Sequence, residues 1–152
     1  MTEDQLNAAL QAEYLQLQKT IEDFDGRALT IKAWSVTFGL VALVSAFATH
    51  APVAFLVAAI SASLFWALEI QWKQFQVAHG ARSGQIEAHF RGERKIEFPF
   101  QIATTWSQTW KNTRSSTFLR IMRWPHVALP HAVVVGLAFM LFILSMAGVI
   151  KP

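Results

Sequence analysis

Two long apolar stretches dominate the chain, one over residues 33–68 and one over residues 124–150. Histidine is the only residue type in either stretch that can gain a charge near neutral pH: His50 lies in the first, and His126 and His131 lie in the second. An apolar run of about 18 residues or more indicates a helix that crosses a lipid bilayer. We therefore predict membrane-spanning helices in both stretches.

The first stretch is too long for one crossing, because a helix rises about 1.5 Å per residue and the apolar core of a bilayer is about 30 Å thick. It is interrupted once, at Thr49-His50-Ala51-Pro52, and proline is tolerated in the first turn of a helix. We predict a hairpin made of Ala33–Ala48 and Pro52–Ile70. Both halves are slightly short, so we expect the helices to extend into the polar arms. The second stretch predicts a third span over residues 126–150.

The N-terminal arm has the pattern of an amphipathic helix. Thr2-Glu3-Asp4-Gln5 matches a capping box, in which the Thr2 and Gln5 side chains satisfy each other's backbone amides. Apolar side chains then recur at spacings of four and three residues, as in a heptad seam. The members of this seam are Leu6, Leu10, Tyr14, Leu17, Ile21, Phe24, Ala28 and Ile31. We expect Gly26 to weaken the helix by about 1 kcal/mol and to mark a joint before the bilayer.

A weaker apolar stripe follows the hairpin and predicts a second amphipathic helix that ends near Phe90. Its members are Trp72, Phe75, His79, Ile86 and Phe90. A break is expected at Glu97-Phe98-Pro99-Phe100. The two seams can be buried against each other, or the N-terminal seam can pair with copies from other subunits, and the sequence leaves both arrangements open.

These patterns predict an all-α integral membrane protein with three transmembrane helices and amphipathic cytoplasmic arms. We expect a single membrane domain over 1–152, with a cytoplasmic helix at 1–32, the transmembrane hairpin at 33–70, a cytoplasmic helix and basic interfacial segment at 71–125, and the third span at 126–150. The composition agrees, since 53% hydrophobic and 15% charged residues is too apolar for an ordinary soluble domain of this length.

The segment TTWSQTWKNTRSSTFLRIMRWP combines aromatic and basic side chains. Trp106 and Trp110 share one helical face, and the basic residues nearby are Lys111, Arg114, Arg120 and Arg123. Such a segment suits the surface of an anionic leaflet. Basic residues interleaved with aromatic ones also bind nucleic acid. Because this segment lies between two spans, we expect the lipid bilayer, and not nucleic acid, as its partner.

The flanking charges predict an orientation. Most lysines and arginines lie in the N-terminal arm or between Gln71 and Pro125, whereas only Lys151 follows the third span. The positive-inside rule then places the N-terminus and the long connection in the cytoplasm and the C-terminus outside. Indole rings favour the headgroup layer, and four tryptophans lie near the predicted inner ends of the spans. They are Trp34, Trp66, Trp72 and Trp124.

Small residues form a stripe along the first span. They are Ser35, Gly39, Ala42, Ala46 and Thr49. Small side chains let helix backbones approach closely in lipid, where no hydrophobic force draws helices together. This stripe can serve packing within one three-helix unit or the assembly of subunits around a shared axis.

Glu69 is the one acidic residue at the edge of the hairpin, in the sequence SLFWALEIQWK. Lys73 follows four residues later, so the two side chains can form an ion pair on one helical face at the membrane boundary. If subunits surround an axis, Glu69 would instead form a charged collar at the inner mouth of a pore.

Sites for enzymatic chemistry are not apparent in the sequence. His126 and His131 are five residues apart, which puts them on different sides of a helix, and neither has an acidic residue nearby. No histidine pair has the spacing of a zinc site, and no phosphate-binding loop or nucleophile elbow occurs. We therefore expect no enzyme activity, no cofactor and no metal.

The arm that runs through LTIKAWSVT into a tight membrane hairpin, followed by a long helix after EIQWKQFQ, resembles small bacterial two-span membrane proteins such as the SLATT-type effectors. The likeness covers roughly Gln5 to Phe90, and the third span is an addition to the two-span pattern. The resemblance implies an oligomeric, membrane-perturbing effector of a defence or stress system in the bacterial inner membrane. We thus expect a homo-oligomer that forms a pore or disturbs the bilayer when triggered. The alternative is a membrane anchor or accessory subunit whose cytoplasmic helices recruit a soluble partner.

Overall fold

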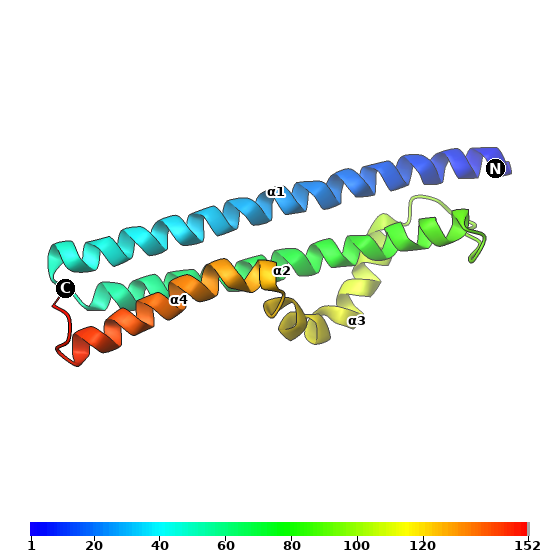
Figure 1. Cartoon of the computed structure of the whole chain (residues 1–152). Helices are drawn as coiled ribbons and strands as arrows, with labels where there is room; N and C mark the ends of the chain where they lie inside the picture. Colours follow the sequence, from blue (N-terminus) through cyan, green and yellow to red (C-terminus); the bar gives the residue numbers. More distant parts are fainter. Residues whose placement is uncertain (152) are drawn as a thin grey trace. The chain divides into compact units, whose positions relative to one another are not determined.

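The computed structural model describes residues 1–151, which form four α-helices (Figure 1). In chain order they are α1 (Glu3–Thr49), α2 (Val53–Phe90), α3 (Ile102–Met122) and α4 (Pro125–Met146). No strand occurs in this part of the chain. The prediction of an all-α fold is confirmed, and three of the helices, α1, α2 and α4, are long and apolar enough to cross a membrane.

The chain divides into two compact units. The arm unit consists of Met1–Arg27 and Trp72–Phe118, and the span unit consists of Ala28–Gln71 and the chain from Leu119 onward. Helices α1 and α2 are each divided between the units, with one segment in the arm unit and the other in the span unit. This division falls close to the limits that hydropathy predicts between the polar arms and the hairpin.

Local chemistry explains where α1 begins. The Thr2 amide donates to Gln5 Oε1 at 3.0 Å, and the Gln5 amide donates to Thr2 Oγ1 at 3.3 Å, which confirms the capping box. Helix α1 continues through Gly26 without a break, and the boundary between the two units falls close to this residue, between Arg27 and Ala28. A single glycine weakens a helix by only about 1 kcal/mol, and its neighbours on both sides are helix-compatible.

Glycines in the left-handed conformation end α2 and α4. Gly92 has a φ of 76°, and the Glu93 amide donates to the Ala88 carbonyl at 2.9 Å. Gly148 has a φ of 72°, and the Val149 amide donates to the Leu144 carbonyl at 3.0 Å. Both are Schellman caps. The first agrees with the predicted end near Phe90, whereas the second ends α4 at Met146, before the predicted limit of 150.

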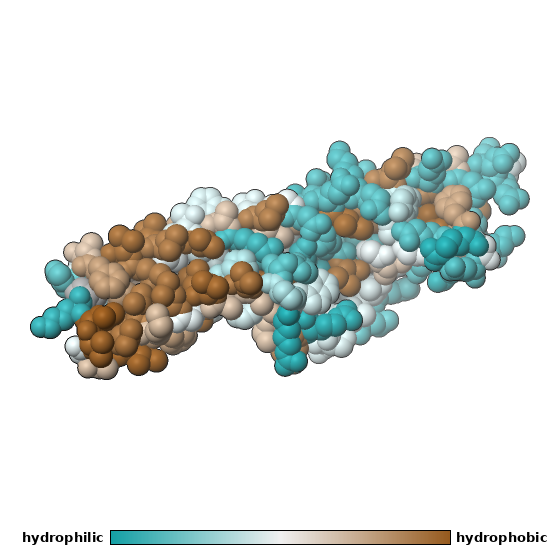
Figure 2. All heavy atoms as spheres, viewed as in Figure 1, coloured by the Kyte–Doolittle hydropathy of each residue, from teal (hydrophilic) through white to brown (hydrophobic). Residues whose placement is uncertain are grey.

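The span unit contains three helical segments that pack around a core of mostly small residues. Its buried cluster is formed by Leu43, Ala46, Phe55, Ala58, Ala59 and Ala138. Each segment has roughly 19 to 22 residues, or about 28 to 33 Å of helix, which matches a bilayer core. The surface is mostly apolar, as Figure 2 shows, with exposed side chains such as Val44, Ile60 and Ile143. This is the surface expected of helices that face lipid.

The arm unit has its own core. Leu6, Leu10 and Leu17 of α1 pack with Ile86 of α2 and with Ile96. The seam on the N-terminal arm is therefore buried against the second amphipathic helix within one chain, which is the first of the two arrangements that the sequence leaves open. Helix α3 covers α2 from one side through Trp106 and Trp110.

Candidate functional site

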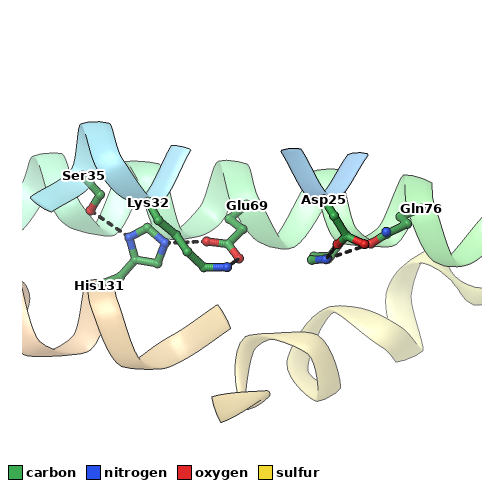
Figure 3. Close-up of polar contacts among 7 residues, drawn as sticks. Asp25, Lys32, Ser35, Glu69, Gln76 and His131 are labelled. Carbon is green, nitrogen blue, oxygen red and sulfur yellow. Dashed lines mark hydrogen bonds and ion pairs between the residues drawn. The ribbon is translucent and has the colours of Figure 1, made fainter. Parts of the chain in front are cut away.

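Four polar side chains from three helices meet inside the span unit (Figure 3). Lys32 and Ser35 belong to α1, Glu69 to α2 and His131 to α4. The His131 Nε2 atom lies 2.8 Å from Glu69 Oε2, and His131 Nδ1 lies 2.8 Å from Ser35 Oγ. The Lys32 Nζ atom lies 2.9 Å from Glu69 Oε1. We call these four residues the polar cluster.

The polar cluster is deeply buried. The side chains of Glu69 and His131 are fully inaccessible to solvent, and the Ser35 residue is also 0% exposed. Only Lys32, whose side chain is 18% exposed, reaches the surface. The indole ring of Trp66 stacks on the His131 imidazole with a centroid distance of 6.3 Å. The cluster therefore connects a partly exposed cation to a buried hydroxyl through a carboxylate and an imidazole.

A close approach of α1 and α4 makes this meeting possible. A Cβ atom at Gly39 would lie 2.5 Å from Cγ1 of Val134, which is too close for any real contact. Gly39 is one turn after Ser35, and Val134 is about one turn after His131. The absence of a side chain at Gly39 thus lets the two backbones approach and brings the Ser35 hydroxyl to the imidazole.

The cluster balances its own charge when the imidazole is neutral. A carboxylate only accepts hydrogen bonds, so the His131 Nε2 proton points to Glu69, and Nδ1 then accepts from the Ser35 hydroxyl. The Lys32 ammonium neutralises Glu69 as an ion pair that lacks the direction of a good hydrogen bond. Burial of a charge without a partner is strongly unfavourable, so each member of the pair stabilises the other.

The order of hydroxyl, imidazole and carboxylate also occurs at the sites of acyl-transfer enzymes. There the hydroxyl faces the substrate and lies beside free amide donors that bind an oxyanion. Ser35 is fully buried inside α1, where backbone amides are bonded along the helix. The geometry of the polar cluster therefore suits a cross-link among three helices better than acyl transfer.

Glu69 and Lys73 do not form the expected ion pair with each other. Glu69 pairs with Lys32 and His131, whereas Lys73 pairs with Asp25 and donates to Gln76 Oε1 at 2.9 Å (Figure 3). Both side chains are buried between helices, and each finds a partner on a neighbouring helix. Such partners replace the weak pair along one helix, which is worth only about 0.2–0.5 kcal/mol.

Lys32 and His131 are functional candidates that sequence reasoning missed. In the sequence, His131 stands out only as a potential metal ligand together with His126. The sequence gives only a weak indication that these residues meet. Lys32 and Ser35 are three residues apart on one face of α1, and each span carries few polar residues. A polar side chain in an apolar helix needs a partner, so these residues could have been paired with one another.

The remaining seam and stripe residues pack within the chain. Leu10, Leu17 and Ala46 are buried. The Tyr14 hydroxyl donates to Glu87 Oε1 at 3.0 Å, the Ile21 carbonyl accepts from Gln76, and the Phe24 ring lies 5.3 Å from Trp72. Ala42 packs against the core of the span unit. Their assignment to contacts between subunits stays a prediction.

The tryptophans expected at the membrane boundary make contacts with other aromatic rings. In the span unit Trp34 stacks on Phe38 and is half exposed, and Trp124 lies 5.4 Å from His126. In the arm unit Trp106 and Trp110 stack on each other at 5.8 Å, and both contact Phe75. The last two rings thus cover α2, while their position relative to a bilayer stays a prediction.

A second buried ion pair lies in the arm unit. Arg82 Nε donates to Glu13 Oε1 at 2.8 Å, and Arg82 Nη2 donates to Glu13 Oε2 at 3.0 Å. The Phe100 amide donates to the same Oε2 at 2.8 Å. Burial favours a higher pKa for the Glu13 carboxyl, but the hydrogen bonds from Arg82 and Phe100 outweigh it, so its pKa lies below the ordinary value.

No group of three or more histidine, aspartate or glutamate side chains that could hold a metal ion occurs within residues 1–151. No protein-family model, curated protein or solved structure matches the chain.

Proposed function

We propose that this chain is a non-enzymatic protein of the bacterial inner membrane that self-associates and permeabilises the membrane when triggered. In this proposal the N-terminus and the arm unit are cytoplasmic and the C-terminus is outside. The polar cluster holds the three spans together in the resting protein. The resemblance to SLATT-type effectors points in the same direction.

One observation carries the proposal: Lys32 reaches the fully buried Glu69 and His131 among apolar helices. Ionisable residues inside membrane spans are costly, and they commonly mark ion pathways or switches. Their charges balance only while the three helices remain in contact. Separation of the helices would expose a carboxylate, an ammonium and an imidazole, and these groups could then line a hydrated path.

Liposome leakage tests this proposal with the full-length protein. Self-association follows mass action, so a rising protein-to-lipid ratio can replace the unknown trigger. We expect leakage of a small dye to rise more steeply than in proportion to protein, and light scattering in detergent to give a mass above one chain. Glu69→Gln removes the charge that Lys32 balances, so leakage should begin at a lower protein-to-lipid ratio.

Glu22→Gln is the matched control, because Glu22 is an exposed acid of the arm unit and the charge change is the same. It should leave the leakage curve unchanged. A protein that stays monomeric and never permeabilises liposomes at any ratio would overturn the proposal.

The alternative function, a membrane anchor that recruits a soluble partner, draws on the exposed aromatic side chains of the arm unit. Phe98 is 68% exposed and Phe100 is 73% exposed. Exposed aromatic side chains on a fixed loop are common anchors of protein interfaces. A cysteine placed at Phe100 that cross-links in cells to a different protein, while the purified chain is monomeric, would favour this alternative.

A further inference from the structure

The arm unit contains a small pocket that combines an acid, a base and aromatic walls. Its volume is about 260 Å³. Pockets that enclose whole drug-sized ligands have roughly 300–1,000 Å³, so this one suits a single small polar group. The pocket is lined by Thr20, Asp23, Phe24, Arg27, Trp72 and His79, all of which belong to the arm unit.

The two charged side chains of this pocket are not paired within the chain. Asp23 and Arg27 are four residues apart on α1, a spacing that permits an ion pair. Neither side chain forms an ion pair or a hydrogen bond to another side chain within residues 1–151. The Arg27 guanidinium instead lies over the Trp72 indole, 5.6 Å from the ring centroid. Its N–H donors are therefore available to an anion.

The rest of the pocket offers acceptors and aromatic faces to a cation. His79 Nδ1 lies 2.9 Å from the Phe75 carbonyl, which can only accept, so Nδ1 carries the proton and Nε2 keeps a lone pair in the neutral ring. The Phe24 and Trp72 rings lie 5.3 Å apart and form adjoining walls. Faces of aromatic rings attract cations. An ammonium group would thus find the Asp23 carboxylate, an imidazole nitrogen and two rings.

The pocket also lies close to the predicted edge of the membrane-spanning stretch. Arg27 precedes Ala33 by six residues and Trp72 follows Leu68 by four, which corresponds to about 6–9 Å of helix. The headgroup layer on each face of a bilayer is about 5–8 Å thick. Asp23 lies one turn further from the span than Arg27. A ligand in this pocket would therefore have its anionic group toward the bilayer and its cationic group away from it.

We propose that this pocket binds the headgroup of a phospholipid that carries a primary ammonium, with the phosphate at Arg27 and the ammonium at Asp23 and His79. The order of charges selects this class, because the phosphate of such a lipid is attached to the glycerol and the ammonium is at the outer end. An anionic headgroup without an amine would leave Asp23 unpaired. A quaternary ammonium lacks the N–H groups that Asp23 and His79 Nε2 can accept.

This inference rests on the membrane insertion in the proposed function, but not on self-association or leakage. Native mass spectrometry of the full-length protein in detergent tests it. The probes are the dioleoyl forms of phosphatidylethanolamine, phosphatidylcholine and phosphatidylglycerol, which differ only in the headgroup. The parent protein should retain phosphatidylethanolamine about fivefold better than the other two, the effect of one partly exposed ion pair. Soluble phosphoethanolamine at the same concentration should not be retained, because it lacks acyl chains.

Two substitutions separate the two halves of the pocket. Asp23→Asn should abolish the preference for phosphatidylethanolamine, because it removes the partner of the ammonium. Arg27→Gln should lower the retention of all three lipids by a similar factor, because each carries the phosphate. Glu22→Gln and Lys19→Gln are the matched controls, since both residues are exposed on the same helix and do not line the pocket. Neither control should change retention.

The outcomes separate this inference from the proposed function. Equal retention of the three lipids by the parent, or a preference that survives Asp23→Asn, overturns the site. Retention of soluble phosphoethanolamine as strong as that of the lipid would identify a free zwitterion as the ligand and also overturns it. A monomeric parent that prefers phosphatidylethanolamine and never permeabilises liposomes overturns the proposed function alone. A self-associating, leaky parent without lipid preference overturns this inference alone.

Discussion

The arm unit and the span unit each bury one carboxylate between helices, and they neutralise it in different ways. Glu13 receives two hydrogen bonds from the planar guanidinium of Arg82 and one from a backbone amide. Glu69 instead contacts Lys32 and His131, which come from two different helices. Arginine presents a rigid planar fork of donors to a carboxylate, whereas the lysine ammonium is a single charged group on a flexible side chain.

This difference indicates two roles for buried charge in one chain. The arrangement around Glu13 is permanent, and it fixes a loop against α1 and α2. The balance around Glu69 depends on contacts from two other helices. In the proposed function the span unit changes its packing, and the second arrangement suits this because a small change in helix position can disturb it.

The largest expected effect comes from Arg82→Ala, which leaves Glu13 buried without a cation. Removal of one partner of a buried ion pair costs about 3–5 kcal/mol of folding free energy. We expect the arm unit to lose most of its protection against hydrogen exchange, measured for Met1–Arg27 in the full-length protein. Exchange in Ala28–Gln71 should change little.

Glu22→Gln again provides the exposed control, and it should change the stability of the arm unit by less than about 1 kcal/mol. If Arg82→Ala had an equally small effect, the permanent role assigned to the Glu13 pair would be wrong.

A smaller effect is expected in the span unit from Gly39→Ala. The added Cβ would lie 2.5 Å from Cγ1 of Val134, so α1 and α4 must move apart at a cost of about 1–3 kcal/mol. The separation should weaken the contact between Ser35 and His131. Thermal unfolding in detergent, followed by circular dichroism, measures the loss.

Val134→Ala removes the side chain that the new methyl group would meet. The double variant Gly39→Ala, Val134→Ala should therefore recover part of the stability lost in the single variant. Additive losses in the double variant would show that the close approach of α1 and α4 does not depend on this contact.

The smallest expected effect is a pH dependence in the arm unit. Because the pKa of Glu13 is lower in the folded protein than its ordinary value of 4.5, the carboxylate stabilises the fold above that pH. This contribution is lost as the pH falls below 4.5 and through the lowered pKa. Hydrogen exchange of Met1–Arg27 at decreasing pH, corrected for intrinsic rates, should show the loss.

In the Glu13→Gln variant, the stability of the arm unit should no longer fall as the pH drops below 4.5. Its dependence on pH above that value should match the parent protein. An unchanged profile would mean that another group, and not Glu13, gives the arm unit its sensitivity to acid.

Most of the helical framework can be predicted from the sequence. The turn at His50, the end of α2 near Phe90 and the capping box at Thr2 all follow from interactions within a few residues. The seam that includes Leu10 and Leu17 is also visible in the sequence, because apolar residues recur at helical spacing. This spacing does not tell whether the seam packs against α2 or against another subunit.

The candidate site is harder to predict because its members are far apart in the chain. His131 is 62 residues from Glu69 and 96 residues from Ser35. The spacing of Glu69 and Lys73 on one helix predicts that they pair with each other. The structure differs because both side chains point into contacts between helices, where Glu69 meets Lys32 and His131 and Lys73 meets Asp25.

Hydrophobic length, helical period and capping residues are local properties, so the sequence alone is enough to establish three helices that can cross a membrane and two amphipathic arms. The tertiary structure decided which polar side chains meet. That outcome depends on how closely α1 and α4 approach at Gly39 and on which face each helix turns inward. Packing of the whole unit sets both quantities, and no single helix contains the information that brings Lys32, Glu69 and His131 together.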